Sequence, residues 1–517
     1  MEATYAIQMK GITKRFGKKV LANDSVDLTI NRGEILSLLG ENGSGKTTLM
    51  NMLAGIYFPD EGQIFVNGKP VTIASPKDAF DNGIGMIHQH FKLVDVFTAA
   101  ENIVLGLKEE GRLDLKAAAA KITEICDRYG FSIDPNKKVY DMSVSEKQTV
   151  EIVKVLYRGA DILILDEPTA VLTPQETDRL FDVMRNMKAD GKAMVIITHK
   201  LHEVMDVSDR VAVLRKGKFI GSVPTKETNP QALTDMMVGH AVTLNINRPD
   251  PQNPTPRLTV KNLTVYDAMD VKRLDNVSFT AMGGEVLGIA GIAGSGQKEL
   301  LEAIAGLQPM REGASIQYRA IGCPEDDSGV QLVGKTPLQI KQAGVALAFV
   351  PEDRLGMGLV GTMGMTGNML LRSYRKGHGI FTDRKTPKAL AEDILNRLEV
   401  ATPNVSFPVR RLSGGNVQKV LVGREIAQEP SVLMTAYAVR GLDINTSYTI
   451  YNLLTEQKMK GVAVVYVGED LDVLLELCDR ILVLCGGQVS GIVDARTTTK
   501  EEVGLLMTRF KKEGSEG

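Results

Sequence analysis

A glycine-rich segment near the start of the chain has the residue types that bind phosphate. Residues 40–47 read Gly-Glu-Asn-Gly-Ser-Gly-Lys-Thr, which fits the P-loop pattern, and they follow the apolar run Ile35–Leu39 and precede a helical stretch. Glycines let successive backbone N–H groups turn toward phosphates, and the start of the helix adds a favourable dipole. The pattern predicts that Lys46 reaches the β- and γ-phosphates of a nucleotide and that Thr47 offers its hydroxyl to Mg²⁺.

Two carboxylates follow a second apolar run. Ile162–Leu165 predicts a buried strand, and Asp166 and Glu167 come directly after it, at the end where doubly wound sheets bind ligands. Asp166 fits a partner of Mg²⁺, and Glu167 fits the base that orients and deprotonates an attacking water in phosphoryl transfer. An Asp-Glu pair alone is typical of a solvated turn, but the apolar run and the P-loop favour catalysis here.

Two further polar residues stand at the ends of apolar runs. His199 follows Ala193–Thr198, and Gln89 ends the run Ile84–Gln89. A histidine or glutamine at the end of a strand is more often only a polar cap. Taken singly, each residue is therefore a weak indication of a functional site.

The elements that must position these residues occur twice. Gly33–Gly45 has a second copy at Gly284–Gly296, and Ser208–Arg210 has one at Cys478–Arg480. Within each copy strands alternate with helices, which predicts an α/β fold with a parallel, mostly buried sheet.

A proline-rich segment separates the two copies. Residues 248–257 contain four prolines in ten positions, which excludes a helix or a central strand and indicates a linker. We therefore predict a first domain at residues 1–242, a linker at 243–257, a second domain at 258–510 and a solvated tail at 511–517.

Length and composition exclude several classes of protein. A chain of 517 residues, with a net charge of −2, 24% charged and 43% hydrophobic residues, is an ordinary multidomain globular protein and not a basic nucleic-acid binder or a disordered chain. The four cysteines are far apart and have no metal-binding spacing, so we expect reduced core thiols. We see no secretory signal and no apolar run of about 18 residues, so a role at a membrane would need another chain to span it.

Together with their spacing, these motifs resemble the ABC transporter ATPase family, and the resemblance covers both halves. The family's signature motif is matched by Leu412–Gln418, which reads Leu-Ser-Gly-Gly-Asn-Val-Gln. The resemblance implies two tandem P-loop NTPase domains, each with a RecA-like core, an antiparallel β subdomain and a helical subdomain. It also implies that Gln89 senses the γ-phosphate and helps to hold Mg²⁺, that His199 contacts the γ-phosphate, and that Phe16 lies against adenine. For Phe16, packing in the core is almost as good an interpretation.

The resemblance further implies that ATP is held between the P-loop of one half and the signature of the other. The catalytic residues of such a crossed site would be Lys46, Gln89, Glu167 and His199, and Mg²⁺ would be held by Thr47, Gln89 and Asp166. The residues expected to bind ATP are Phe16, Gly40, Glu41, Asn42, Gly43, Ser44, Gly45, Lys46, Thr47, Thr48, Ser413, Gly414, Gly415, Asn416 and Asp443.

The opposite crossed site lacks nearly every one of these groups. Gln297 stands at the position of Lys46, and Lys298, one residue later, is turned by about 100° around a helix. Ala436 and Tyr437 replace the carboxylate pair, and Glu469 replaces His199. Three further differences fall on the same site. The signature at 142–146 lacks the glycines, Thr173 replaces the loop aspartate, and the segment 349–354 has no glutamine. We therefore expect one hydrolytic site and one degenerate site that either holds nucleotide or stays empty.

Three functions compete. The first is the energy-coupling ATPase of a membrane importer, the second a soluble tandem ATPase acting on ribosomes, and the third a module whose ATP is only structural. The short proline-rich linker, the single degenerate site and the complete first site favour the importer.

Within the importers, the chain resembles the sugar and nucleoside group through Pro-Glu-Asp-Arg at 351–354. His88–Phe91 and Ala100–Gly106 resemble its nucleoside branch, and a simple sugar such as ribose or galactose is the alternative. The resemblance implies peripheral attachment to the cytoplasmic face of the cell membrane through two permease subunits, an indirect link to an extracytoplasmic solute-binding protein, no nucleic acid, and ATP with Mg²⁺ as cofactors.

Overall fold

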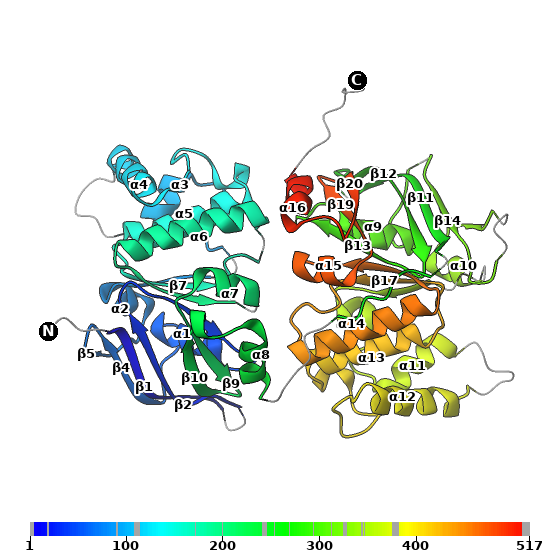
Figure 1. Cartoon of the computed structure of the whole chain (residues 1–517), viewed down its shortest axis with the longest axis horizontal. Helices are drawn as coiled ribbons and strands as arrows, with labels where there is room; N and C mark the ends of the chain where they lie inside the picture. Colours follow the sequence, from blue (N-terminus) through cyan, green and yellow to red (C-terminus); the bar gives the residue numbers. More distant parts are fainter. Residues whose placement is uncertain are drawn as a thin grey trace. The chain divides into compact units, whose positions relative to one another are not determined.

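The computed structural model describes residues 5–17, 20–88, 91–107, 114–170, 172–198, 200–239, 246–252, 254–267, 269–292, 294–311, 313–323, 328–342, 345, 347–374 and 382–508. The chain divides into two compact units, Met1–Leu244 and Asn245–Gly517, here called unit 1 and unit 2. Figure 1 colours unit 1 from blue to green and unit 2 from green to red.

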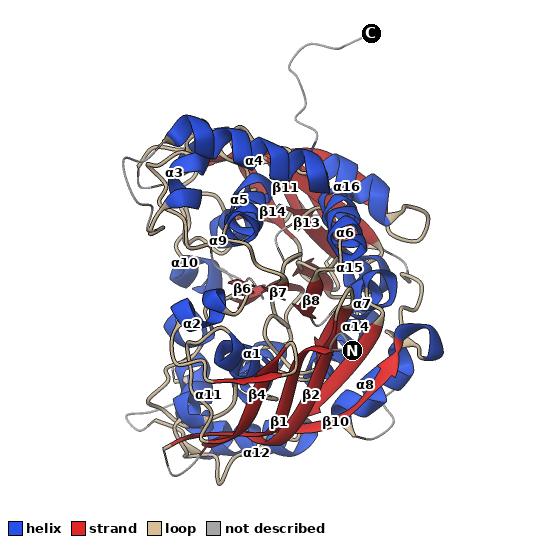
Figure 2. Ribbon diagram, turned by 90° about the vertical axis from the view of Figure 1, so that its left-hand side faces the viewer, coloured by secondary structure: helices blue, strands red, loops and turns tan. Residues whose placement is uncertain are grey.

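Unit 1 contains an antiparallel sheet of four strands in the order β2-β1-β4-β5. Their bounds are Tyr5–Phe16 (β1), Val20–Asn31 (β2), Glu61–Val66 (β4) and Lys69–Val71 (β5). The second half of β2 alternates buried apolar residues with more exposed polar ones, because only one face of such a sheet packs on the core. These strands are the arrows labelled β1, β2 and β4 in Figure 2.

The second sheet of unit 1 has six strands in the order β10-β9-β3-β8-β7-β6, with only β10 antiparallel to its neighbour. The strands are Ile35–Leu39 (β3), Ile84–Ile87 (β6), Ile162–Asp166 (β7), Ala193–Ile197 (β8), Arg210–Arg215 (β9) and Lys218–Pro224 (β10). Every residue of β3 and β8 is buried, as expected for parallel strands that are covered on both faces.

The helices of unit 1 form a helical subdomain and a cover for the parallel sheet. They are Lys46–Leu53 (α1), Pro76–Asp81 (α2), Ala99–Val104 (α3), Leu115–Tyr129 (α4), Val144–Tyr157 (α5), Pro174–Ala189 (α6), Leu201–Val207 (α7) and Pro230–Val238 (α8). Helices α3, α4 and α5 share a small core around Ile103, Ile122 and Val150. This core defines the helical subdomain.

Unit 2 repeats both sheets, in the orders β12-β11-β14-β15 and β16-β17-β18-β13-β19-β20. The strands are Thr255–Tyr266 (β11), Lys272–Gly283 (β12), Val286–Gly291 (β13), Ser315–Tyr318 (β14), Val330–Gln331 (β15), Leu347–Val350 (β16), Val432–Ala436 (β17), Ala463–Val467 (β18), Arg480–Cys485 (β19) and Gln488–Asp494 (β20). Read from its opposite edge, the second sheet has the same order as its counterpart in unit 1. The predicted fold class of two tandem α/β domains is confirmed.

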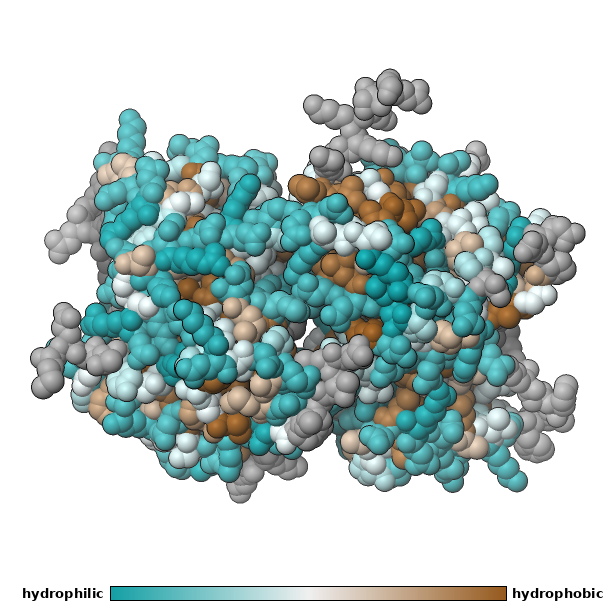
Figure 3. All heavy atoms as spheres, viewed as in Figure 1, coloured by the Kyte–Doolittle hydropathy of each residue, from teal (hydrophilic) through white to brown (hydrophobic). Residues whose placement is uncertain are grey.

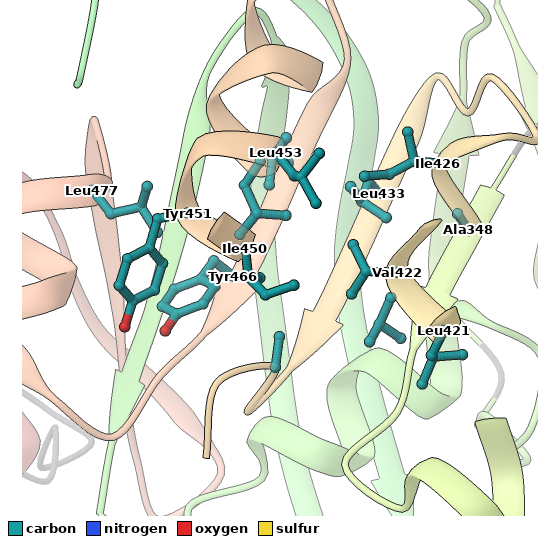
Figure 4. Close-up of a cluster of buried hydrophobic side chains, with 14 of the residues drawn as sticks. Ala348, Leu421, Val422, Ile426, Leu433, Ile450, Tyr451, Leu453, Tyr466 and Leu477 are labelled. Carbon is teal, nitrogen blue, oxygen red and sulfur yellow. The ribbon is translucent and has the colours of Figure 1, made fainter. Parts of the chain in front are cut away.

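The helices of unit 2 follow the same plan. They are Gln297–Ile304 (α9), Pro337–Gln342 (α10), Met365–Ser373 (α11), Lys385–Arg397 (α12), Gly414–Ile426 (α13), Ile444–Met459 (α14), Leu471–Leu477 (α15) and Lys500–Thr508 (α16), with a π-helical turn at Arg354–Gly358. In the main core the rings of Tyr451 and Tyr466 meet edge to face at 6.3 Å, next to Ile450 and Leu477 (Figure 4). The absence of tryptophan leaves aliphatic side chains as the bulk of this core.

The first part of the predicted linker is hydrogen-bonded to unit 2. Arg248 donates to the carbonyls of Leu475 and Cys478 at 2.7 and 2.6 Å, and the buried Lys458 donates to the carbonyl of Pro249. Strand β11 begins inside the proline-rich stretch and lies between β12 and β14, so the segment reaches into a central strand. Pro256 fits there because it pairs only with β12, before the pairing with β14 begins.

The face drawn in Figure 3 is mostly hydrophilic, with smaller hydrophobic patches between polar and charged side chains. Among the described residues, none of the helices combines the length and the apolar character that crossing a membrane requires. Three cysteines, Cys126, Cys478 and Cys485, are buried free thiols, whereas the free thiol Cys323 is partly exposed and outside the cores.

Candidate functional site

The P-loop of unit 1 connects β3 to α1 in a backbone conformation that requires glycine. Gly40 and Gly45 have φ values of 152° and 98°. A Cβ on Gly40 would lie 2.2 Å from the carbonyl oxygen of Leu214, and one on Gly45 would lie 2.4 Å from that of Ala22. Side chains are therefore excluded at both positions, and the loop closes tightly over the end of the strand.

The start of α1 is open to an anion. Its N-cap, Gly45, has no side chain to cap the helix, and the first turn holds no acidic residue. The Oγ of Ser44 is buried without a hydrogen-bond partner in the same loop. Uncapped N–H groups and an orphaned hydroxyl are the groups that a phosphate satisfies.

Lys46 is buried and folds back onto its own loop. Its Nζ donates to the carbonyls of Gly40 and Glu41 at 2.6 and 3.0 Å. Burial lowers the pKa of Lys46, whereas the negative charges of Glu167 and Asp166 oppose that shift. The ammonium group of Lys46 thus lies in the electrostatic field of the two carboxylates.

The two carboxylates stand where β7 ends, and β7 is separated from β3 only by β8. Burial, reinforced by the charge of Glu167, raises the pKa of Asp166 to about 6, and Lys46 opposes the shift. Glu167 has a φ of 49° and donates its N–H to the carbonyl of Ile197 at 2.8 Å. The two carboxylates and the exposed Thr47 at the start of α1 form a set of oxygen donors that suits Mg²⁺.

The other predicted residues of unit 1 lie in different surroundings. Gln89 and His199 fall outside the described residues. Phe16 ends β1 with 39% of its surface exposed, and it meets Tyr57 edge to face at 5.2 Å. Phe16 is therefore a surface aromatic and not a core residue. Sequence reasoning did not single out Tyr57, although Ile56, Tyr57 and Phe58 form an exposed apolar run after α1.

The signature of unit 2 forms the start of α13. Ser413 is the N-cap and accepts from the N–H of Asn416, and the first turn holds no acidic residue. A Cβ on Gly415 would lie 3.1 Å from Thr446 Oγ1 and 3.3 Å from Asp443 Oδ2. The structure thus brings the predicted loop residue Asp443 against the signature. Glycine at 415 permits this close approach, and beyond the Ser413 cap the first turn carries no acidic residue.

The corresponding helix start in unit 1 is closed by its own side chains. Ser143 caps α5 and accepts from the N–H of Glu146, whose carboxylate accepts from the N–H of Ser143 at 2.7 Å. Lys137 pairs with the same carboxylate at 2.7 Å. A carboxylate already satisfies this helix terminus, so a phosphate would meet a negative charge there.

The P-loop of unit 2 keeps its backbone turn but not its charge. Gly296 has a φ of 100°, close to that of Gly45. Gln297 stands in place of Lys46 and donates to the carbonyl of Ile292 at 3.2 Å, as Lys46 does to that of Glu41. Lys298 is exposed and lies 3.8 Å from Glu302. An uncharged amide therefore occupies the position of the buried ammonium group.

The ligand edge of the unit 2 sheet combines apolar and charged side chains. A cavity of about 280 Å³ beside Ala436 is lined by Phe349, Pro351 and Met357 and by Lys298, Glu302, Glu352 and Asp353. Burial, with the charges of Glu469 and Glu352, raises the pKa of Tyr437 to about 12, so its phenol stays protonated. Ala436 and the protonated phenol of Tyr437 therefore do not replace the two carboxylates of unit 1.

The strand register corrects one expectation about this edge. Ile87 pairs with Leu165 in unit 1, and Val350 pairs with Thr435 in unit 2. Glu352 therefore follows β16 by the same two residues by which Gln89 follows β6. The position of the glutamine does have a counterpart, and it is occupied by a carboxylate.

Comparisons with known proteins agree with this geometry. The family described as ABC transporter matches residues 23–170 and 274–435. The nucleoside import ATP-binding protein of Lactococcus lactis subsp. cremoris is 41% identical over 507 residues, which is 97% of each chain. The guanosine import ATP-binding protein of Bacillus subtilis is 42% identical over 509 residues, again 97% of each chain.

A third relative, the glucose import ATP-binding protein of Haloferax volcanii, is 39% identical over 537 residues, which is 97% of this chain and 95% of that protein. The two segments that match the family contain the two P-loops, and the first also contains Asp166 and Glu167. The chain belongs to the ABC transporter family, as an ATPase in which the family's ATP-binding domain is present twice.

Proposed function

We propose that this ATPase drives a membrane importer and that the transported solute is a nucleoside. The observation that carries the proposal is the complete set of Lys46, Thr47, Asp166 and Glu167 at one sheet edge of unit 1, in a chain that matches import ATP-binding proteins over 97% of its length. The names of two relatives at 41% and 42% identity favour a nucleoside, and the glucose relative at 39% keeps a simple sugar as the second candidate.

ATP would bind with its phosphates over the P-loop of unit 1. The N–H groups of the loop and of the start of α1 would hold the β- and γ-phosphates, and Lys46 would turn from its own carbonyls to them. Thr47, Asp166 and Gln89 would hold Mg²⁺, which neutralises phosphate charge. Glu167 would orient and deprotonate the attacking water, and His199 would contact the γ-phosphate.

The remaining members of the proposed site bind the other parts of the nucleotide. Phe16 offers an exposed ring for stacking on adenine. The signature residues of unit 2, together with Asp443, would contact the same ATP. The first turn of α13, which holds no acidic residue, and the start of α5, which is capped by Glu146, support this assignment.

Hydrolysis would occur at one site only. Gln297, Ala436 and Tyr437 supply neither the ammonium group nor the carboxylates that the chemistry needs. We therefore assign turnover to the P-loop of unit 1 and a noncatalytic role to that of unit 2.

The proposed partners are two permease subunits, which would place the chain at the cytoplasmic face of the membrane. The helical subdomains between P-loop and signature would contact the permeases. An extracytoplasmic solute-binding protein would act on the chain only through them.

The experiment that tests the solute is ATPase stimulation of the reconstituted complex. The chain is assembled in liposomes with its permease subunits and solute-binding protein, and ribonucleosides, deoxynucleosides, pentoses and hexoses are added in turn. We expect stimulation by nucleosides. Stimulation by a sugar alone would replace the nucleoside with the sugar and leave the importer assignment intact.

A further inference from the structure

In unit 2 one arginine joins loops at the ligand edge of the parallel sheet. The guanidinium of Arg440 pairs with Glu352, with 2.5 Å between Nη1 and Oε1, and with Glu469, with 3.4 Å between Nε and Oε1. Glu352 follows β16 and Glu469 follows β18, on either side of β17. Alanine stands at the corresponding position of unit 1, Ala170, and its methyl side chain cannot form such ion pairs.

A second arginine continues the link to the signature. Nη2 of Arg354 donates to the backbone carbonyl of Arg440. Nη1 of Arg354 lies 3.2 Å from the point that a Cβ on Gly414 would occupy. The guanidinium of Arg354 therefore packs against Gly414, the first glycine of the signature. Burial lowers the pKa of Arg354.

The turn that carries Arg354 follows α13 along its length. At its far end, Arg424 of α13 donates from Nη2 to the carbonyl of Gly358 at 2.7 Å. Gly358 packs so closely on Leu421 that a Cβ there would lie 2.8 Å from its Cδ2. The turn Arg354–Gly358 is thus fixed to the signature helix near both ends of that helix.

We infer that Arg354 and Arg440 are positioning residues that hold the signature Leu412–Gln418 in its working conformation without nucleotide in unit 2. The inference rests on the proposed function, in which this signature contacts ATP at the P-loop of unit 1. In the proposed function Gln89 and His199, which follow the corresponding strands of unit 1, would contact the γ-phosphate, and this contact would hold their loops. In unit 2 the arginine and two carboxylates supply that constraint permanently.

The test uses the full-length chain and separates turnover from nucleotide binding. Arg354→Gln and Arg440→Gln are compared with wild type for kcat and KM of ATP hydrolysis and for the Kd of a fluorescent ATP analogue. We expect kcat to fall about tenfold or more, because a small displacement of a positioned group has a large effect on rate. KM and Kd should stay within about twofold, since the P-loop of unit 1 is unchanged.

Two further variants sharpen the interpretation. Arg354→Lys keeps a donor for the carbonyl of Arg440 and should recover part of kcat, and the double variant Arg354→Gln/Arg440→Gln should lose no more than the worse single variant. The matched control is Arg397→Gln, which breaks an exposed pair with Glu456 elsewhere in unit 2 and should keep wild-type kcat.

The outcomes distinguish the inference from the proposed function. Wild-type kcat in Arg354→Gln, or additive losses in the double variant, would overturn the positioning role. Gly415→Asp places a carboxylate at the signature itself. If Gly415→Asp also keeps full turnover, the proposed function fails. If it abolishes turnover while both arginine variants remain active, only the positioning role fails.

Discussion

Glu167 and Tyr437 share one backbone conformation in the two units. Their φ values are 49° and 51°, and each N–H donates to the carbonyl of the residue that ends the neighbouring strand, Ile197 at 2.8 Å and Val467 at 3.0 Å. Left-handed φ values are uncommon for residues other than glycine, so the turn is a preserved structural feature. The difference between the two sheet edges lies in the side chains and not in the backbone.

Glu167→Gln is expected to remove nearly all ATP turnover. The amide keeps the shape of the side chain but cannot accept a proton, and loss of a general base lowers rates by about 10² to 10⁴-fold. Phosphate release by the full chain measures the effect. Tyr437→Phe at the matching turn of unit 2 is the control and should retain near wild-type turnover. A Glu167→Gln protein that hydrolyses ATP at the wild-type rate would contradict the assignment of Glu167 as the general base.

One nucleotide is expected to bind per chain. Lys46→Ala should abolish binding of Mg²⁺-ATP, because it removes the buried ammonium group of the open P-loop. Gln297→Ala, at the same position of the other loop, should leave the stoichiometry at one. Titration calorimetry or native mass spectrometry gives the count. Two equivalents in the wild type, one of them lost in the Gln297 variant, would contradict the prediction.

The stability of the Mg²⁺-free chain should depend on pH through Asp166. Its pKa in the folded state, about 6, lies above the usual value of about 3.9, so ionisation destabilises the fold as pH rises between these two values. Asp166→Asn should therefore raise Tm in EDTA at pH 7.5, by roughly 2 to 4 °C, and by less at pH 5.

The control for this effect is Asp190→Asn. The hydrogen bond from Tyr129 and that from Arg128 lower the pKa of Asp190, so its ionised form is stabilising and the amide should not raise Tm at pH 7.5. Equal Tm gains for Asp166→Asn at both pH values would exclude ionisation of Asp166 as the cause.

Lys458→Met is expected to destabilise unit 2 by about 3 kcal/mol. Lys458 and Asp479 form a pair at 2.8 Å with side chains only 1% and 5% exposed, and removal of the lysine leaves a buried carboxylate with weaker compensation. Lys188 and Asp209 form the same pair in unit 1, but are 37% and 39% exposed. Lys188→Met should change stability by under about 1 kcal/mol in urea melts. Equal effects would refute the explanation from burial.

Local patterns in the sequence predicted the elements that carry the first site. The run Ile35–Leu39 coincides with β3, and Ile162–Leu165 lies within β7, because continuous apolar runs next to glycine or acidic residues are typical of buried parallel strands. The lysine and the two carboxylates come together because parallel strands end at one edge of a sheet.

Contacts between distant segments were beyond sequence reasoning. Arg354 and Arg440 carry ordinary charges in the sequence, and their connection depends on how the loops after two strands pack on α13. The docking of the proline-rich segment on unit 2 also depends on tertiary structure, because Arg248 reaches carbonyls more than 220 residues away.

With the helix start of α5 sealed by the carboxylate of Glu146, each transport cycle would consume a single ATP. An ABC ATPase with two open signatures can use two. The free energy for one import event would then be the hydrolysis of one phosphoanhydride bond, which limits how steep a solute gradient the complex can maintain. An importer that hydrolyses one ATP per cycle would use less ATP for each imported solute and would maintain a smaller concentration gradient.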